Sequence, residues 1–392
     1  MLSKESFLLI VFLLNPILGI CLCVSLALSG QNRRLCLPLI FACSLYMAAL
    51  NTTKEIAGDE IVYVDHFKQV PQNGYVKTLS HLNPDGTVEE PVYGTLVYVL
   101  FYITFGSPMM FIALITFITY VVFLLAIYRL EKKYRAQNYI IVATVITLVS
   151  FTQFFFMTAH LIRQFLATSF FFLALSYKGE SLKKYVLFCF VSFSIHMSMA
   201  SLIFISLIPQ LNKLLNKKGL VIAAVVTVIL STVFPILAGS LLSSFAIAGD
   251  ANTLLERASQ AEGMDDGSGS LSPFLLLIVC APLVIISVLG IIKRRIYLPG
   301  IVYNLCLIWC LFVLSLSFSP LIQYRFFFVL YFFIPIMLFL VFREKMLLSK
   351  CYCTIICIFF VFRFFVTYNE GGFHYAPISD IIFMPYPMLI NF

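Results

Sequence analysis

The chain has 392 residues, of which 61% are hydrophobic and 11% are charged, and its formal net charge is +8. A soluble domain contains about a quarter charged residues, so this composition excludes an ordinary soluble protein. The positive charge does not indicate a nucleic-acid-binding surface, because the basic residues lie in short loops between apolar segments.

Apolar segments of membrane-spanning length recur along the whole chain. Because one span needs about 20 mainly apolar residues, we predict an all-α polytopic membrane protein of roughly 11–13 transmembrane helices. They would form a single integral membrane domain over residues 1–392. The first segment lacks a basic start and a cleavage site, which predicts a retained span. The predicted spans are 6–28, 35–50, 109–128, 139–158, 162–177, 219–242, 272–292, 298–318, 325–342 and 350–366.

The basic loops predict the orientation of these spans, because loops rich in Lys and Arg stay in the cytoplasm. The loops 51–91 and 243–271 and the C-terminal tail 367–392 are then extracytoplasmic, and so is the N-terminus. The six basic loops hold most of the 26 Lys and Arg and are 33–34, 129–135, 178–184, 213–218, 293–295 and 343–350.

Two apolar segments differ from a plain span. Segment 92–105 is short, and we predict that it is re-entrant or interfacial, with a tilted full span as the alternative. Segment 185–211 is too long for one upright span and too short for two, at about 1.5 Å per residue. We therefore predict two short helices that meet at His196. Discontinuous helices of this kind usually line a polar cavity.

Arginine side chains within apolar segments are the first candidates for a functional site. Arg163 and Arg325 have polar neighbours, Gln164 in one case and Gln323 and Tyr324 in the other. Arginine offers a rigid fork of donors that suits phosphate or pyrophosphate. For Arg363 we favour a side chain that reaches lipid headgroups.

A histidine at the expected helix break is the second candidate. A lone His in a membrane helix can simply bond to a neighbouring hydroxyl, and Ser194 and Ser198 are close to His196. The predicted break and the nearby Arg163 favour a functional role, because buried ionisable residues are costly in a membrane.

Carboxylates of the first long loop are the third set of candidates. Asp59 precedes Tyr63 by four residues, which places both on one face of a helical turn. Glu90 directly precedes Pro91. A carboxylate beside an anion site serves as a general base or accepts hydrogen bonds from sugar hydroxyls. The remaining acids of the loop are expected to be solvated.

Other chemistries lack a sequence signal. We find no phosphate-binding glycine loop, no HExxH motif and no cysteine pattern with zinc spacing. The sequence therefore predicts no metal, no cofactor and no nucleic-acid partner.

The order of these motifs resembles that of the EpsG family of bacterial Wzy-like polysaccharide polymerases. The resemblance spans most of the chain and is clearest over 55–201. It rests on Asp59-x3-Tyr63, Glu90-Pro91, the turn Lys132-Lys133-Tyr134, Arg163-Gln164, Lys183-Lys184, His196-x-Ser198, Arg325 with Tyr331, and a tail rich in Tyr and Pro.

The resemblance implies a GT-C-type glycosyltransferase in the bacterial inner membrane with an extracytoplasmic site. The donor would be a glycan on undecaprenyl pyrophosphate, and the acceptor a lipid-linked oligosaccharide repeat unit of capsule, O-antigen or exopolysaccharide. Arg163 and Arg325 would bind the pyrophosphate, with His196 as a phosphate contact or proton acceptor. Asp59 or Glu90 would be the base or hold acceptor hydroxyls. A flippase and a chain-length regulator are possible protein partners.

Two other functions remain open. A lipid-linked oligosaccharide flippase would carry polar residues along both leaflets and often has similar halves, whereas here the polar residues are expected on one side. A membrane acyltransferase would place its basic and histidine residues on the cytoplasmic face.

Overall fold

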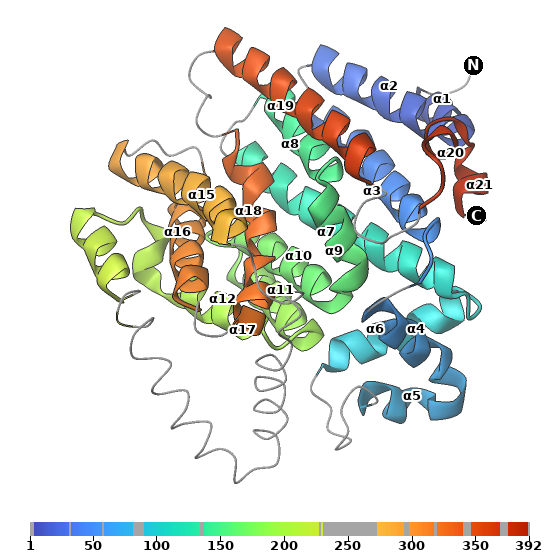
Figure 1. The fold of residues 1–392 in the computed structure, drawn as a ribbon, viewed down its shortest axis with the longest axis horizontal. Coiled ribbons are helices and arrows are strands. Elements are labelled where there is room, and N and C mark those ends of the chain that lie inside the picture. Colours follow the sequence, from blue (N-terminus) through green and yellow to red (C-terminus); the bar gives the residue numbers. More distant parts are fainter. Residues whose placement is uncertain are drawn as a thin grey trace. The chain divides into compact units, whose positions relative to one another are not determined.

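The computed structural model describes residues 4–30, 33–56, 59–80, 90–133, 137–226, 229, 273–293, 298–316, 320–339, 346–368 and 375–390. All regular structure in these ranges is helical, which confirms the predicted all-α class. The chain divides into two compact units, which we describe separately (Figure 1). Unit 1 comprises Met1–Ile203 and Phe342–Phe392, and unit 2 comprises Phe204–Val341.

The helices of unit 1 come from both ends of the chain. They are α1 (Lys4–Leu14), α2 (Pro16–Ser29), η1 (Arg33–Leu35), α3 (Cys36–Thr52), α4 (Asp59–Lys68), α5 (Val70–Ser80), α6 (Pro91–Ile103), α7 (Pro108–Lys133), α8 (Asn138–Val149), α9 (Thr152–His160), α10 (Ile162–Tyr177), α11 (Leu182–Ile195), α19 (Met346–Thr367), α20 (Ile378–Phe383) and α21 (Tyr386–Ile390). Helix α12 (Met199–Leu207) crosses the boundary between the units.

Helix α7 forms the centre of unit 1 and packs against α3 on one side and α10 on another (Figure 1). Its 26 residues span about 39 Å at 1.5 Å per residue, enough to cross a bilayer. Buried polar side chains tie it to its neighbours, because Nδ2 of Asn51 donates to the hydroxyls of Thr116 and Thr158. The core of unit 1 is therefore held by hydrogen bonds as well as by apolar packing.

Within the described ranges, four helical segments are long and apolar enough to cross a membrane, or five if a bent pair counts as one span. They are Arg33–Thr52, Pro108–Lys133, Phe274–Ile292 and Lys350–Thr367, and the bent pair is α8 with α9, at 58°. These helices agree with a multi-pass membrane protein. The predicted first span, 6–28, is interrupted at Asn15, whose side chain caps α2 by accepting from the backbone N–H of Leu18.

Both segments predicted to depart from a plain span do so. Segment 92–105 corresponds to α6, whose 13 residues cover only about 20 Å. Segment 185–211 breaks where predicted, since α11 ends at Ile195, His196 is extended, and α12 begins at Met199. Much of the predicted span 219–242, the loop 243–271 and residues 81–89 lie outside the described residues.

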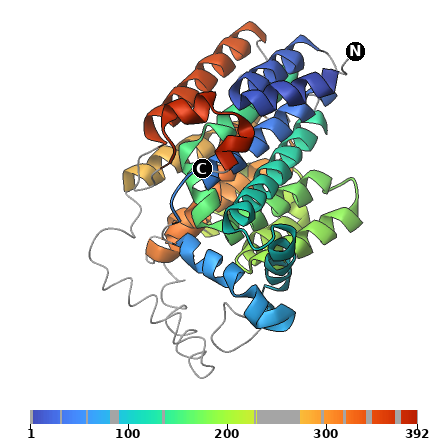
Figure 2. The same cartoon turned by 90° about the vertical axis from the view of Figure 1, so that its right-hand side faces the viewer.

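The C-terminal tail folds back on the first helices (Figure 2). The Tyr46 hydroxyl on α3 donates to the carbonyl of Ile381, and Nδ2 of Asn15 donates to that of Ile382. The rings of Phe12 and Tyr386 lie 5.1 Å apart. Tail and N-terminal helices therefore form one packed layer of unit 1.

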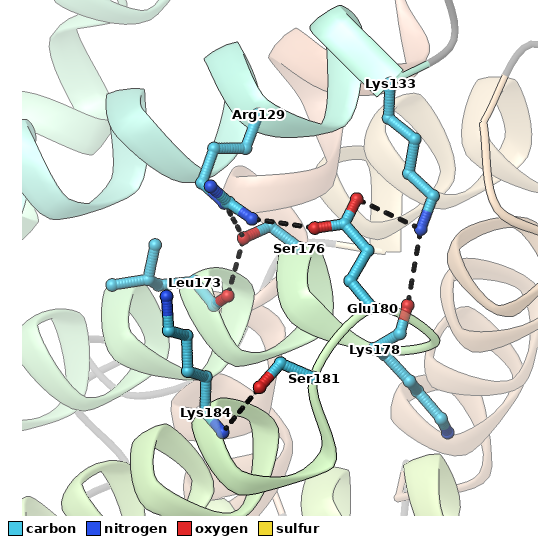
Figure 3. Close-up of polar contacts among 8 residues, drawn as sticks. All are labelled: Arg129, Lys133, Leu173, Ser176, Lys178, Glu180, Ser181 and Lys184. Atoms are coloured by element: carbon cyan, nitrogen blue, oxygen red, sulfur yellow. Dashed lines mark hydrogen bonds and ion pairs between the residues drawn. The ribbon is translucent and has the colours of Figure 1, made fainter.

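Basic side chains gather at the C-terminal ends of α7 and α10 (Figure 3). Arg129 and Lys133, both on α7, turn toward Glu180 in the turn after α10, at 2.9 and 3.4 Å. The guanidinium of Arg129 also lies 3.7 Å from the ring centre of Tyr177. The ends of α7 and α10 that lead into the predicted cytoplasmic loops thus lie together.

Unit 2 contains η2 (Pro209–Asn212), α15 (Pro273–Lys293), α16 (Gly300–Ser315), α17 (Pro320–Phe327) and α18 (Leu330–Met337). A Cβ at Gly290 of α15 would lie 2.6 Å from the ring of Tyr303, so only glycine allows α15 and α16 to approach this closely. Asn304 of α16 donates to the carbonyls of Leu211 and Lys213 and holds η2 in place.

Candidate functional site

Three helix ends of unit 1 bring a glutamate, an arginine and a histidine together. Glu90 is the residue before α6, Arg163 lies in the first turn of α10, and His196 follows the end of α11. Nη1 of Arg163 lies 2.5 Å from Oε2 of Glu90, and Nδ1 of His196 lies 2.6 Å from Oε1. One carboxylate thus bridges both basic side chains. We call these three residues the Glu90 cluster.

Local sequence explains why Glu90 is available for these contacts. Pro91 opens α6, where a missing N–H costs nothing, and Glu90 occupies the preceding cap position. The Glu90 side chain makes no capping hydrogen bond to α6. Its two oxygens therefore turn toward Arg163 and His196.

The break at His196 presents its ring to the site. The backbone of His196 is extended, with φ −155° and ψ 117°, while its N–H still bonds to the carbonyl of Ser192. The N–H of Met199 bonds to the carbonyl of His196 and opens the next helix. Both backbone polar groups of His196 are thereby satisfied, as a non-helical segment within an apolar stretch requires.

Two tyrosines surround the guanidinium of Arg163. Its central carbon lies 5.6 Å from the ring centre of Tyr63 on α4 and 5.9 Å from that of Tyr93 on α6. Both tyrosines are buried. Cation–π contacts at these distances help to hold the guanidinium in one orientation.

The charge state of the cluster follows from its contacts. Burial alone would raise the pKa of Glu90, but the hydrogen bond from His196 and the charge of Arg163 outweigh it, so the pKa lies below the ordinary value. Glu90 is therefore a carboxylate at neutral pH. A carboxylate only accepts, so Nδ1 of His196 donates to it, and Nε2 is the ring nitrogen that Glu90 does not use.

Several polar atoms around the cluster have no hydrogen-bond partner among the described residues. They are Nε of Arg163, the hydroxyl of Tyr93 and the hydroxyl of Ser198, and all three are buried. Buried polar atoms are normally paired, because leaving one unsatisfied costs about 1–3 kcal/mol. This set suits a polar ligand that accepts from Arg163.

The other residues predicted for the site lie in varied surroundings. Gln164 is buried beside Arg163 in α10. Asp59 is exposed in the first turn of α4, and no contact joins it to the Glu90 cluster among the described residues. Tyr324, whose ring lies 4.5 Å from that of Phe328, and the exposed Arg325 belong to α17 in unit 2.

Sequence reasoning missed a buried ion pair in unit 1. Lys54 pairs with Glu60, and both side chains are almost fully buried. Helical periodicity could have indicated this glutamate, because Glu60, Tyr63, Val64 and Phe67 form the buried face of α4. Asp59 lies just outside that face.

Comparison with known proteins gives one match. The sequence model of the EpsG family matches residues 34–378. EpsG itself is linked to exopolysaccharide synthesis. No curated protein and no solved structure matches the chain. Because the match covers most of the 392 residues, this chain belongs to the EpsG family.

Proposed function

We propose that the protein is a polysaccharide polymerase of GT-C type, acting at the extracytoplasmic face of the bacterial inner membrane. It would transfer a glycan from undecaprenyl pyrophosphate to a lipid-linked oligosaccharide repeat unit. Membership of the EpsG family supports the link to polysaccharide synthesis. The observation that carries the proposal is the bridge from Glu90 to both Arg163 and His196.

The proposed glycosyl transfer requires one group that accepts a proton and another that stabilises negative charge. The acceptor hydroxyl attacks the anomeric carbon of the donor sugar, and the bond from that carbon to the pyrophosphate oxygen breaks. The hydroxyl proton passes to a base, and the electron pair leaves with the lipid pyrophosphate. A pyrophosphate is a good leaving group, so it needs stabilisation of charge more than a protonating acid.

His196 suits the role of base. The carboxylate of Glu90 accepts from Nδ1 and thereby orients the ring and stabilises its protonated form, while Nε2 takes the proton of the acceptor hydroxyl. Glu90 is then a positioning residue, because both of its oxygens are already used by His196 and Arg163. Asp59, the other candidate base, is exposed and is better suited to contacts with acceptor hydroxyls.

Arg163 suits the pyrophosphate. Nη1 is used by Glu90, whereas Nε is buried without a hydrogen-bond partner among the described residues, so Nε is the donor that a phosphate oxygen can meet. Glu90 cancels the charge of Arg163, and a pyrophosphate dianion therefore needs another cation. We propose that Arg325 supplies it, with Tyr324 beside it as a glycan contact.

Deletion of the gene in its native host, followed by a ladder gel of surface glycan, tests the class of function. We expect the ladder to collapse to single repeat units and to return with the wild-type gene but not with His196→Gln. Loss of all surface glycan with lipid-linked units trapped inside would instead identify a flippase. An unchanged ladder would contradict a role in this assembly altogether. A chain-length regulator would act as a partner of the polymerase and alter only the ladder's length distribution.

A labelling experiment tests the orientation. Asp59→Cys and Lys183→Cys, each in a protein with Cys21→Ser and Cys351→Ser, place one thiol at an exposed position on either expected side. A membrane-impermeant maleimide should modify position 59 in whole cells and position 183 only after permeabilisation. The reverse result would contradict an extracytoplasmic site and favour the acyltransferase.

A further inference from the structure

Unit 1 contains a groove that the proposed reaction does not use. It has a volume of about 820 Å³ and lies between α2, α8 and α19. This volume is in the range of pockets that bind small molecules or lipid chains.

The walls of the groove are apolar, and some of the side chains that form them are exposed. Val24 and Leu28 come from α2, Val142 and Ile146 from α8, and Ile358 from α19. Leu28 and Ile358 are 51% and 64% exposed. Large exposed apolar side chains beside a long apolar helix indicate a surface that faces hydrocarbon. A hydrocarbon chain fits such walls without desolvation of polar groups.

One end of the groove is positively charged. Arg33 donates from Nη1 to the carbonyl of Lys132, so its other nitrogens stay available, and Lys350 at the start of α19 is exposed. Nζ of Lys350 lies 5.8 Å from the ring centre of Tyr139, which keeps the ammonium beside the groove. None of the described residues that line the groove is acidic. The charged end is therefore complementary to an anion.

Hydrogen bonds fix the relative positions of the helices that form the charged end of the groove. Nδ2 of Asn138 donates to the carbonyls of Ala27 and Gly30, at 2.9 and 2.7 Å, and so joins the start of α8 to the end of α2. The sulfur of Cys357 lies 3.6 Å from the carbonyl of Ala143 and brings α19 against α8. The groove is thus formed by the fold itself, which is the state that a ligand needs in order to bind without reorganising the protein.

The groove is separate from the Glu90 cluster. Arg33 reaches the C-terminal end of α7, where Arg129 also meets Tyr177 at the end of α10. Arg163 lies in the first turn of that same helix, roughly 21 Å away along the axis at 1.5 Å per residue. The two sites therefore lie toward opposite ends of α10.

We propose that the groove binds an anionic glycerophospholipid, with the phosphate between Arg33 and Lys350 and an acyl chain along α2, α8 and α19. The basic loops at this end place it in the cytoplasmic leaflet, where anionic headgroups attract juxtamembrane Lys and Arg. A lipid held here joins α19 to α2 and α8 and stabilises the folded protein by mass action. The site is independent of the polymerase reaction proposed above.

Native mass spectrometry of the detergent-purified full chain tests the proposal, with phosphatidylglycerol and phosphatidylcholine as probes. We expect phosphatidylglycerol to bind at least tenfold more tightly and to raise the midpoint of thermal unfolding. The double variant Arg33→Gln/Lys350→Gln should lose this preference. The matched control Lys183→Gln/Lys184→Gln removes the same charge from the same basic end, outside the groove, and should keep it.

Further measurements separate lipid binding from simpler explanations. Thr354→Phe fills the groove from an exposed position and should weaken phosphatidylglycerol binding with both cations in place. Inorganic phosphate alone should not raise the unfolding midpoint. The proposal would be overturned by equal affinity for the two lipids or by an equal loss of preference in the two double variants. It would also be overturned if Thr354→Phe bound phosphatidylglycerol tightly, or if inorganic phosphate alone gave the full stabilisation.

Discussion

Oε1 of Glu90 lies 2.6 Å from Nδ1 of His196, although 106 residues separate the two in the chain. The other carboxylate oxygen lies 2.5 Å from Nη1 of Arg163. Glu90 therefore decides the orientation of both basic groups that the proposed reaction uses. The following expectations test this relationship and the fold that supports it.

Glu90→Gln should reduce polymerisation at least about a hundredfold, because a neutral amide neither stabilises protonated His196 nor orients Arg163 as a carboxylate does. The rate can be measured with the purified protein and lipid-linked repeat units extracted from the deletion strain. Asp65→Asn is the matched control, since it also neutralises a carboxylate but at an exposed position that has no proposed role. If Asp65→Asn lost as much activity as Glu90→Gln, the positioning role of Glu90 would lose its support.

Arg163→Lys should lower the turnover number by about tenfold to a hundredfold, because lysine keeps the charge but loses the planar fork. The surface glycan of cells carrying this variant should be shorter on a ladder gel. Arg363→Lys makes the same change at an exposed position on α19 and should leave polymer length unaltered. Full-length polymer with Arg163→Lys would rule out a pyrophosphate role for Arg163.

The protein should lose stability at acid pH through Glu90. Its pKa in the folded protein lies below the ordinary value of 4.5, so the unfolded chain binds this proton more readily than the folded one. The stability from Glu90 is complete above pH 4.5 and is lost as the pH falls through the lowered pKa. Below pH 4.5 the midpoint of thermal unfolding should fall more steeply for the wild type than for Glu90→Gln. Parallel declines would contradict this assignment.

The pair of Lys54 and Glu60 should respond differently to single and double substitution. Glu60→Gln leaves a buried ammonium without its counter-charge and should destabilise the protein by about 3–5 kcal/mol. Replacing both partners, as Lys54→Met/Glu60→Leu, removes both charges and should recover much of that loss. Thermal unfolding of the wild type, the single variant and the double variant in detergent gives the comparison. A double variant less stable than Glu60→Gln would mean that the charges themselves are required.

The break in segment 185–211 shows how far chain length and hydropathy can predict structure. A mainly apolar segment of 27 residues fits neither one span nor two, and polar side chains near its middle surround His196. The structure ends α11 at Ile195 and starts α12 at Met199, as that reasoning predicted. Such a prediction succeeds because helix length and membrane thickness are local quantities that the sequence carries directly.

The roles of Asp59, Glu60 and Glu90 show where the sequence was insufficient. Asp59 was one of the two acids singled out in its loop, with Glu90, yet its neighbour Glu60 is the buried one. One residue turns a helix by about 100° and so changes the face that a side chain occupies. The sequence also left Glu90 as one of two possible bases. Its contacts with both Arg163 and His196 support the positioning role that we propose for it.

The sequence by itself determined the all-α membrane class, the family and the residues able to form an anion site. Hydropathy indicates the membrane class, motif order indicates the family, and side-chain type indicates the anion-binding residues, all without knowledge of distances. Only the tertiary structure decided that Glu90 meets Arg163 and His196, and that Lys54 meets Glu60. The physical reason is that an ion pair depends on a few ångströms between helices far apart in the chain, and helix packing alone sets those distances.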